Sequence, residues 1–323
     1  MHMAKIDIVG FGAMNIDGLY RVDELVVDGE QQVTDFDSLP GGSAANTIYG
    51  LAKLGVKTGF VGAVGNDEAG KELLSDFEAA AVDTGQIRVK RTATGSTICL
   101  SDKLGRRAIY VFPGANNLLN SKDIDVAYFN NARVVHLTSF ADDRQLKLQV
   151  DLVKRLKSSV KVSLAPGMLY AVKGLKALMP LLKRTHIAFM NREEIEGLTG
   201  KDFRAGTREL MKLGCRIVVV TLGKGLAESR VGMVTARICD GKKEYEVGSE
   251  KVSPKSVLET TGAGDAFAAG FLFGFLKGNS VEECGLLGDI MAGFVIREVG
   301  ARAGFPTLAR LSQKYLKRSG RSL

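Results

Sequence analysis

The chain has 323 residues, enough for one large α/β domain with a sizeable core, alone or with an appendage. Its 45% hydrophobic and 25% charged residues are ordinary for a globular protein, and no apolar run is long enough to span a membrane. The net charge of +8 attracts anions; since no aromatic-rich basic patch accompanies it, the charge favours a small phosphorylated ligand over nucleic acid.

Short apolar runs ending in Gly, Pro, Asn or Ser alternate with helical patterns along most of the chain. The predicted strands are residues 6–12, 58–65, 134–140, 160–166, 186–191 and 215–223, and the clearest helical patterns are residues 43–55, 69–82 and 143–157. This alternation predicts a mostly parallel sheet with helices on both faces. Ligands bind at the carboxyl edge of such sheets, so we expect Asn15, Asp17, Asn191 and Thr221 to converge on one crevice.

Two glycine-rich stretches resemble nucleotide-binding motifs but lack an essential residue. "GFGAMN" (10–15) begins like a dinucleotide fingerprint, yet Asn15 occupies the third glycine position and no crossover helix is predicted after it. "GNDEAGKE" (65–72) has the spacing of a P-loop, but Glu72 replaces the hydroxyl residue that binds magnesium. We interpret the second stretch as a turn and a helix start, with Asp67 and Glu68 in the first turn.

Residues 17–40 and 92–114 break the α/β pattern. Both alternate polar and apolar positions and contain hairpin-like breaks at glycines, so they predict a small β-sheet beside the main domain. Such a sheet could be a lid over the crevice, an edge extension or a dimerisation surface, and a lid can also form the dimer interface. The core is then residues 1–16, 41–91 and 115–310, and residues 311–323 are expected to be a solvated basic tail.

The stretch "ETTGAGDAFAAGF" (259–271) starts a strongly apolar helix with small residues and a charge. The first amides of a helix lack intrahelical partners, and glycines let a phosphate approach them, so Gly262, Ala263 and Gly264 are a candidate anion hole. Asp265 would repel a phosphate unless it accepts or orients the proton of an attacking hydroxyl. The alternative from these residues alone is a tight turn followed by a helix-start acid.

The remaining reactive side chains give little catalytic signal. Four cysteines lie far apart without a Cys-x-x-Cys pair, which indicates reduced thiols and neither a metal site nor disulfides. His136 and His186 lie in apolar runs and are interpreted as core residues. With no signal peptide recognised, a cytoplasmic location is expected.

Five motifs in order resemble the ribokinase-like (PfkB) family of sugar and nucleoside kinases, from the first strand to about Thr307. They are "PGGSAANTIYGLAKLG" (40–55), "NREE" (191–194), "VVVTLG" (218–223), "ETTGAGDAFAAGF" (259–271) and "GARAGFPT" (300–307). The resemblance implies a three-layer α/β/α domain with a mostly parallel central sheet and a small β-sheet lid. It implies an ATP- and magnesium-dependent kinase that phosphorylates a primary hydroxyl of a sugar or nucleoside.

The same resemblance implies roles for individual residues. Asp265 would be the catalytic base, with the amides of residues 262–264 as the anion hole. The acceptor's hydroxyls would be held by Asp17, Gly41, Gly42 and Asn46. Magnesium and its waters would be ordered by Asn191 and Glu194, which can also form a helix capping box. The nucleotide would be lined by Asn191, Thr221, Gly223, Gly300 and Ala301.

Several residues depart from the family pattern and leave the acceptor and the cation open. Glu259 stands where potassium-activated members carry an aspartate, so a potassium site there is in question. Gly225 arrives one residue early, which leaves nucleotide contacts after Gly223 unassigned, and Ser43 replaces the lysine of many ribokinases. Arg106 and Arg107 could bind a second phosphate, as a 6-phosphofructokinase-like acceptor needs, or form a solvated turn. A 2-keto-3-deoxygluconate kinase and a non-catalytic sugar- or nucleotide-binding protein are also compatible with the sequence. The oligomeric state is left open, with a homodimer through the lid as one alternative.

Overall fold

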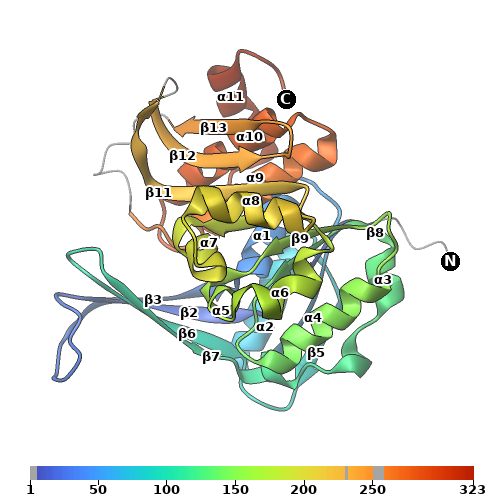
Figure 1. The fold of residues 1–323 in the computed structure, drawn as a ribbon. Helices are drawn as coiled ribbons and strands as arrows, with labels where there is room; N and C mark the ends of the chain where they lie inside the picture. Colours follow the sequence, from blue (N-terminus) through green and yellow to red (C-terminus); the bar gives the residue numbers. More distant parts are fainter. Residues whose placement is uncertain (1–5, 230–231, 250–257) are drawn as a thin grey trace.

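The computed structural model describes residues 6–229, 232–249 and 258–323. Its largest element is a nine-stranded sheet in the order β13-β12-β11-β10-β9-β8-β1-β4-β5 (Figure 1). Every pairing between β11 and β5 is parallel, whereas β12 and β13 are added antiparallel. The strands are β1 Ile6–Phe11, β4 Thr58–Gly65, β5 Asp83–Lys90, β8 Ala132–Thr138, β9 Lys161–Ala165, β10 Thr185–Asn191, β11 Ile217–Ser229, β12 Gly232–Cys239 and β13 Glu244–Ser249.

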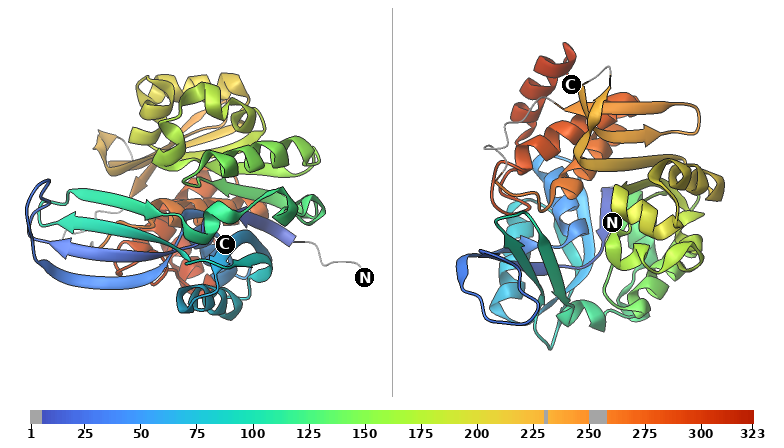
Figure 2. Two further views of the ribbon diagram at one scale, coloured as in Figure 1. Left: turned by 90° about the horizontal axis from the view of Figure 1, so that it is seen from below. Right: turned by 60° about the vertical axis from the view of Figure 1, so that its left-hand side comes forward.

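Helices cover both faces of this sheet and give the three layers expected from the alternating pattern (Figures 1 and 2). One core layer contains buried residues of α1, α2, α9, α10 and α11, and the other those of α3 to α8. The helices are α1 Ser43–Lys53, α2 Glu68–Ala79, α3 Val126–Asn130, α4 Asp143–Arg155, α5 Gly167–Ala171, α6 Gly174–Leu182, α7 Arg192–Thr199, α8 Phe203–Leu213, α9 Ala263–Lys277, α10 Val281–Val295 and α11 Leu308–Ser319; the short 3-10 helices are η1 Gly114–Leu118 and η2 Ser121–Asp123.

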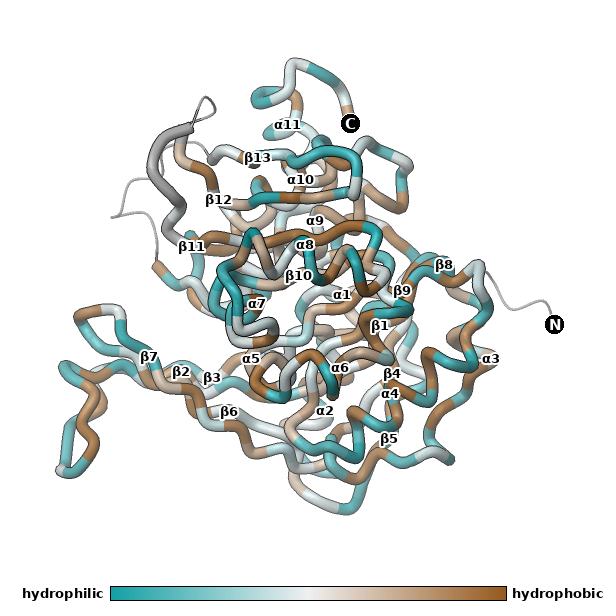
Figure 3. Tube along the Cα trace, viewed as in Figure 1, coloured by the Kyte–Doolittle hydropathy of each residue, from teal (hydrophilic) through white to brown (hydrophobic). Residues whose placement is uncertain are grey.

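Strand β11 shows why the central strands are apolar on both faces. Val219 packs into the core layer that contains α9, while Val218 and Val220 pack into the opposite layer. Side chains alternate between the two faces of a strand, and both faces are covered here, so the run must be continuously hydrophobic. The central strands are accordingly largely brown in Figure 3, whereas α4 alternates between teal and brown along its length.

A second, four-stranded sheet projects from the core in the order β3-β2-β6-β7 (Figure 1, lower left). Its strands are β2 Asn15–Val22, β3 Val33–Gly41, β6 Gly95–Asp102 and β7 Arg107–Phe112, which lie almost wholly within the two segments predicted for it. Asp17 and Thr97 are register partners in β2 and β6 and therefore lie on the same face. The opposite face is apolar: the large side chains of Phe36, Ile98, Tyr110 and Phe112 are exposed on it, and that of Tyr20 is half-buried.

The C-terminal segment differs from the solvated basic tail expected for residues 311–323. It forms most of α11, in which Leu311 and Tyr315 are buried against the core. These two residues are four positions apart, so they lie on one side of the helix while the basic residues occupy the remainder. The basic composition concealed this apolar stripe, and the expectation of a solvated tail was wrong.

The two stretches that resemble nucleotide-binding motifs form other local structures. β1 is followed directly by β2 of the small sheet, where a dinucleotide fold has a crossover helix. Asp67 caps α2, and its side chain accepts a hydrogen bond from the amide of Gly70 at 2.9 Å. In the part of the chain that the structure describes, no helix has both the length and the hydropathy that a membrane crossing requires.

Candidate active site

Helix α9 begins at a turn that only a glycine can occupy. Gly262 is the N-cap and adopts a left-handed conformation (φ 79°), and a Cβ there would lie 2.5 Å from the Cβ of Ala301. The Ala263 amide donates to Thr260 O at 3.3 Å, and no side chain caps the helix. No heavy atom outside the local helix lies within 4 Å of the position that a Cβ on Gly264 would take. The helix start is therefore open to a ligand on the side of Gly264.

The carboxylate of Asp265 is held by the first turns of α1. Ser43 Oγ donates to Asp265 Oδ1 at 2.6 Å, and Asn46 Nδ2 donates to Asp265 Oδ2 at 2.9 Å. Thr47 Oγ1 also donates to the backbone carbonyl of Asp265 at 3.3 Å. Burial raises the pKa of Asp265 to about 6, although the bonds from Ser43 and Asn46 act in the opposite direction. The result is an oriented carboxylate that is largely ionised at neutral pH and retains basicity.

Asp17 lies near Asp265, on the face of the small sheet that carries Thr97. Thr97 Oγ1 donates to Asp17 Oδ1 at 2.7 Å, and burial raises the pKa of Asp17. A Cβ on Gly41 would lie 2.0 Å from Asp17 Oδ2, so a larger residue there would displace the Asp17 carboxylate. Gly42, at φ 95°, is the N-cap of α1 and would place a Cβ 2.3 Å from a backbone oxygen. The charge of Asp17 also raises the pKa of Asp265, as expected of two carboxylates facing one space.

Asn191 and Glu194 form the capping box that was one of the two interpretations of their spacing. The Glu194 amide donates to Asn191 Oδ1 at 2.7 Å, and the Asn191 amide donates to Glu194 Oε2 at 2.9 Å. Burial raises the pKa of Glu194, and the charge of Asp265 contributes to that rise. Asn191 pairs with Thr221 across β10 and β11, so both lie at the carboxyl edge of the sheet, and Gly223 follows at φ 58°.

Gly300 and Ala301 join the small sheet to the start of α9. A Cβ on Gly300 (φ 88°) would lie 2.4 Å from Leu39 Cδ1 of β3, and Ala301 is buried against Gly262. These contacts bring the closing motif to the turn at Gly262, the candidate anion hole. The nucleotide contact expected of these two residues stays a prediction, as do those of Thr221 and Gly223.

The carboxylate of Glu259 is already engaged by several donors. Its Oε1 accepts hydrogen bonds from the Thr260 amide at 2.8 Å, the Thr261 amide at 3.0 Å and Thr261 Oγ1 at 2.9 Å. Arg107 of β7 lies 3.5 Å from the same oxygen. Burial raises the pKa of Glu259, but the bonds from Thr261 and Thr260 and the charge of Arg107 together outweigh it, and the net pKa is lowered. A monovalent cation fits poorly at an oxygen that faces a guanidinium.

Two site residues were not predicted from the sequence. The sequence shows Ser43 only as a departure from the family pattern. Ser43, Asn46 and Thr47 stand at i, i+3 and i+4 of one helix, and this spacing could have indicated that one face of α1 is polar. Arg302 is 7% exposed and donates to Asn46 Oδ1 at 3.0 Å. Its signal was a charge inside a closing motif otherwise made of small and apolar residues.

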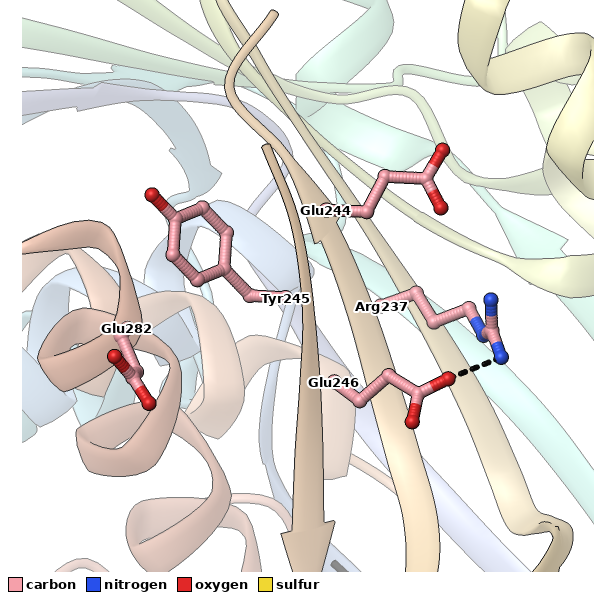
Figure 4. A pocket seen from close by; sticks show the side chains of 5 residues that line it. All are labelled: Arg237, Glu244, Tyr245, Glu246 and Glu282. Atoms are coloured by element: carbon pink, nitrogen blue, oxygen red, sulfur yellow. Dashed lines mark hydrogen bonds and ion pairs between the residues drawn. The ribbon is translucent and has the colours of Figure 1, made fainter. Parts of the chain in front are cut away.

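Two other features lie outside this arrangement. His136 is a core residue, as expected: it is buried, its Nδ1 lies 2.9 Å from Ser163 Oγ, and burial lowers its pKa to about 3. A pocket at the sheet edge formed by β13 is lined by three glutamates, a tyrosine and an arginine that pairs with a glutamate (Figure 4). Its carboxylates do not suit a phosphate ligand. The residues lining it are Arg237, Glu244, Tyr245, Glu246 and Glu282.

The layered fold with its second, smaller sheet is that of the ribokinase-like α/β class of proteins. The model of the pfkB family carbohydrate kinases matches residues 5–308, so the chain belongs to this family. The family consists of kinases, and the chain is an enzyme of this kind.

Several known proteins are similar to this chain over most of its length. An uncharacterized sugar kinase of Archaeoglobus fulgidus is 39% identical over 257 residues, which are 80% of this chain and 98% of that protein. The structure of Arabidopsis thaliana ribokinase complexed with ribose and ATP matches with a TM-score of 0.77 at 26% identity, covering 97% of this chain and 99% of that one. A Burkholderia thailandensis nucleoside kinase in complex with inosine matches with a TM-score of 0.83 at 18% identity, covering 98% of this chain and 100% of that one, and supports the fold alone.

Proposed function

We propose that this protein transfers the γ-phosphoryl group of ATP to a primary hydroxyl of a sugar or nucleoside. The observation that carries the proposal is the Asp265 carboxylate, held by Ser43 and Asn46 beside the open start of α9, with its pKa raised to about 6. At neutral pH this group is mostly ionised and can accept a proton from an alcohol that becomes acidic as it attacks.

In the proposed reaction, the acceptor oxygen forms a bond to the γ-phosphorus while the bond from that phosphorus to the β,γ-bridging oxygen breaks. The hydroxyl proton goes to Asp265, and ADP leaves. Asp17, with Gly41, Gly42 and Asn46, orients the acceptor's hydroxyls, and the helix start at residues 262–264 stabilises the charge on the phosphoryl oxygens. The nucleotide lies along Thr221, Gly223, Gly300 and Ala301.

Magnesium would fit near Glu194 and Asn191. The charge of Asp265 helps to raise the pKa of Glu194, and a divalent cation would relieve that repulsion. Among the described residues, no group of three or more His, Cys, Asp or Glu side chains could hold a metal, so Asn191 and Glu194 would act mainly through waters. When bound, magnesium would neutralise phosphate oxygens. We propose that potassium is not required, because Glu259 faces Arg107.

The acceptor is proposed to lack a phosphate of its own. Arg106 donates from Nε to Asp102 at 2.6 Å and lies 3.2 Å from Glu24, while Arg107 lies beside Glu259, so both lid arginines have acidic partners. A 6-phosphofructokinase-like acceptor would need to displace these carboxylates. Because a relative from Thermoanaerobacterium thermosaccharolyticum is named an ATP-dependent 6-phosphofructokinase, the assay below includes fructose 6-phosphate. The 2-keto-3-deoxygluconate kinase alternative is also in the test.

The small sheet is proposed to act as a lid formed by residues 17–40 and 92–114. Arg107 Nη1 donates to Thr261 Oγ1 at 3.4 Å, and Leu39 packs on Gly300, so the sheet contacts the anion-hole turn. Its exposed apolar outer face is suited to pair with the same face of a second copy, which would make a homodimer. The four free thiols agree with a cytoplasmic location.

The test is ADP release with ATP and magnesium across ribose, fructose, fructose 6-phosphate, 2-keto-3-deoxygluconate, adenosine, inosine and cytidine, with and without potassium. Asp265→Asn should lower turnover by about 10²–10⁴-fold while ATP binding stays intact. Asp289→Asn, which alters a carboxylate paired with Arg318 on α11, is the matched control and should retain turnover. Near-normal turnover of Asp265→Asn would show that the base is assigned wrongly, and ATP binding without any turnover would favour the non-catalytic alternative.

A further inference from the structure

Arg302 is a buried charge directly behind the proposed catalytic base. Arg302 is 7% exposed. Its guanidinium carbon lies 5.3 Å from the ring centroid of Tyr49 and 5.1 Å from that of Phe77. Burial of an unpaired charge is costly, so a guanidinium persists in such a place only when its N–H groups have partners. The partners of this guanidinium therefore indicate what it does.

Its three nitrogens have three different partners, two of them in the candidate site. Nε donates to Asn46 Oδ1 at 3.0 Å, Nη2 donates to the backbone carbonyl of Gly41 at 3.0 Å, and Nη1 pairs with Asp76 of α2. Asp76 supplies the counter-charge. The other two bonds go to the residue that holds the base and to the glycine that lies against Asp17.

The contact with Asn46 determines how its amide is oriented. A guanidinium can only donate hydrogen bonds, so the oxygen of the Asn46 amide must face Arg302. The amide nitrogen then faces Asp265, which as a carboxylate can only accept, and the observed distance is 2.9 Å. Without Arg302, the amide oxygen of Asn46 would lose its donor, and the side chain could move away from the position in which its nitrogen meets the carboxylate.

We propose that Arg302 is a positioning residue for phosphoryl transfer: it fixes the Asn46 amide so that Asp265 is oriented, and it fixes the Gly41 carbonyl beneath the acceptor. This inference rests on the proposed function of Asp265 and Asp17. A purely stabilising arginine would need only Asp76 and the two rings, and its loss would lower stability without a selective effect on the acceptor step.

The experiment is a double-mutant cycle on purified, folded protein with ATP, magnesium and the acceptor that releases most ADP. Arg302→Met should lower kcat by about 10–100-fold and raise the acceptor KM, with the KM for ATP within about twofold, because small misplacements of reacting groups have effects of this size. In the Asn46→Ala background, the same substitution should lower kcat by no more than about threefold, since residues acting through one another are not additive.

Arg318→Met is the matched control. Arg318 is also a largely covered arginine, with its side chain 11% exposed. It pairs with Asp289 and donates to a backbone carbonyl at 2.6 Å, but it lies on α11 away from the site. It should lower the melting temperature while kcat and both KM values stay within about twofold. If Arg302→Met does not fold, Arg302→Lys replaces it in the same cycle; a lysine keeps the charge but cannot donate in a planar fork to all three partners.

Each outcome decides the inference. Loss of kcat by the Arg302 variant in the wild-type background and not with Asn46→Ala supports it. Equal losses in both backgrounds, or an Arg302→Lys enzyme with unchanged kcat and acceptor KM, would overturn it. If the wild-type protein releases no ADP with any acceptor, the proposed function itself fails. That failure differs from the two outcomes that overturn the role of Arg302, because both of those require an active wild-type enzyme.

Discussion

The hydrogen bond from Ser43 to Asp265 gives a sharp test of the proposed base, because it stabilises the ionised carboxylate of Asp265 more than the protonated form. Ser43 Oγ donates to Asp265 Oδ1 at 2.6 Å, and this bond lowers the pKa that burial has raised to about 6. Ser43→Ala removes the donor and leaves Asn46 on the other oxygen. The ionised form loses stabilisation, so the pKa of Asp265 should rise further.

The size of the effect follows from the strength of such bonds. A hydrogen bond to a charged group contributes about 1.5–3 kcal/mol, and one pKa unit corresponds to about 1.4 kcal/mol, which gives a rise of about one to two units. Water can replace part of the lost bond, so we expect about one unit. A base works only when ionised, so the rate rises with pH through its pKa. At pH 6 the ionised fraction would fall from about one half to about one tenth, a roughly fivefold loss that disappears near pH 8.5.

The assay is kcat/KM for the acceptor at saturating ATP between pH 5 and 9, for wild type, Ser43→Ala and the control Ser280→Ala. Ser280 is the N-cap of α10 and has no contact with Asp265, so its variant should keep the wild-type acid limb. An acid limb of Ser43→Ala that coincides with wild type, or a rate deficit equal at every pH, would refute the assignment of Asp265 as the titrating base.

Two further predictions concern the walls of the site and the small sheet. Gly41→Ala places a Cβ 2.0 Å from Asp17 Oδ2, so the acceptor KM should rise by at least about tenfold with little change in the KM for ATP. The control is Gly293→Ala, which has open space around it and should leave both KM values unchanged. An unaltered acceptor KM in Gly41→Ala would show that Asp17 does not bind the acceptor. Tyr110→Asp on the outer face of the small sheet should convert a dimer to monomers in sedimentation, and Val89→Asp on β5, equally exposed, should not; if the wild type is already monomeric, the proposed dimer is wrong.

The fold was predictable because its signals are local. The runs that became β4, β10 and β11 are apolar on both faces, and α9 is apolar around most of its circumference, so short windows of sequence identify them. The end of β11 was not predictable in this way. The predicted strand ended at Gly223, yet the strand continues to Ser229 because it pairs antiparallel with β12, and that pairing is decided by tertiary contacts.

The site was predictable only in part, because its chemistry depends on contacts between distant segments. Asp265 and the glycines before it form one continuous stretch, which a motif can describe. The donors that orient the carboxylate come from α1, with Ser43 at a separation of 222 residues, and Arg302 reaches Asn46 across 256 residues. A single sequence records that these residues are polar or charged and leaves open which of them meet.

Arg302 and Lys277 show why the charge of a residue could not by itself predict whether its side chain lies at a helix end or in the interior. Both are cations at or near the ends of apolar segments, and Lys277 lies in the last turn of α9, where a cation favours the helix dipole. Arg302 instead enters the interior and is paired there with Asp76. What separates them is the contact of Arg302 with the rings of Tyr49 and Phe77, which forms only once α1 and α2 pack beside the closing motif. The orientation of the proposed base is therefore a property of the packed core, and variants of that packing should alter the chemistry while leaving the GAGD motif unchanged.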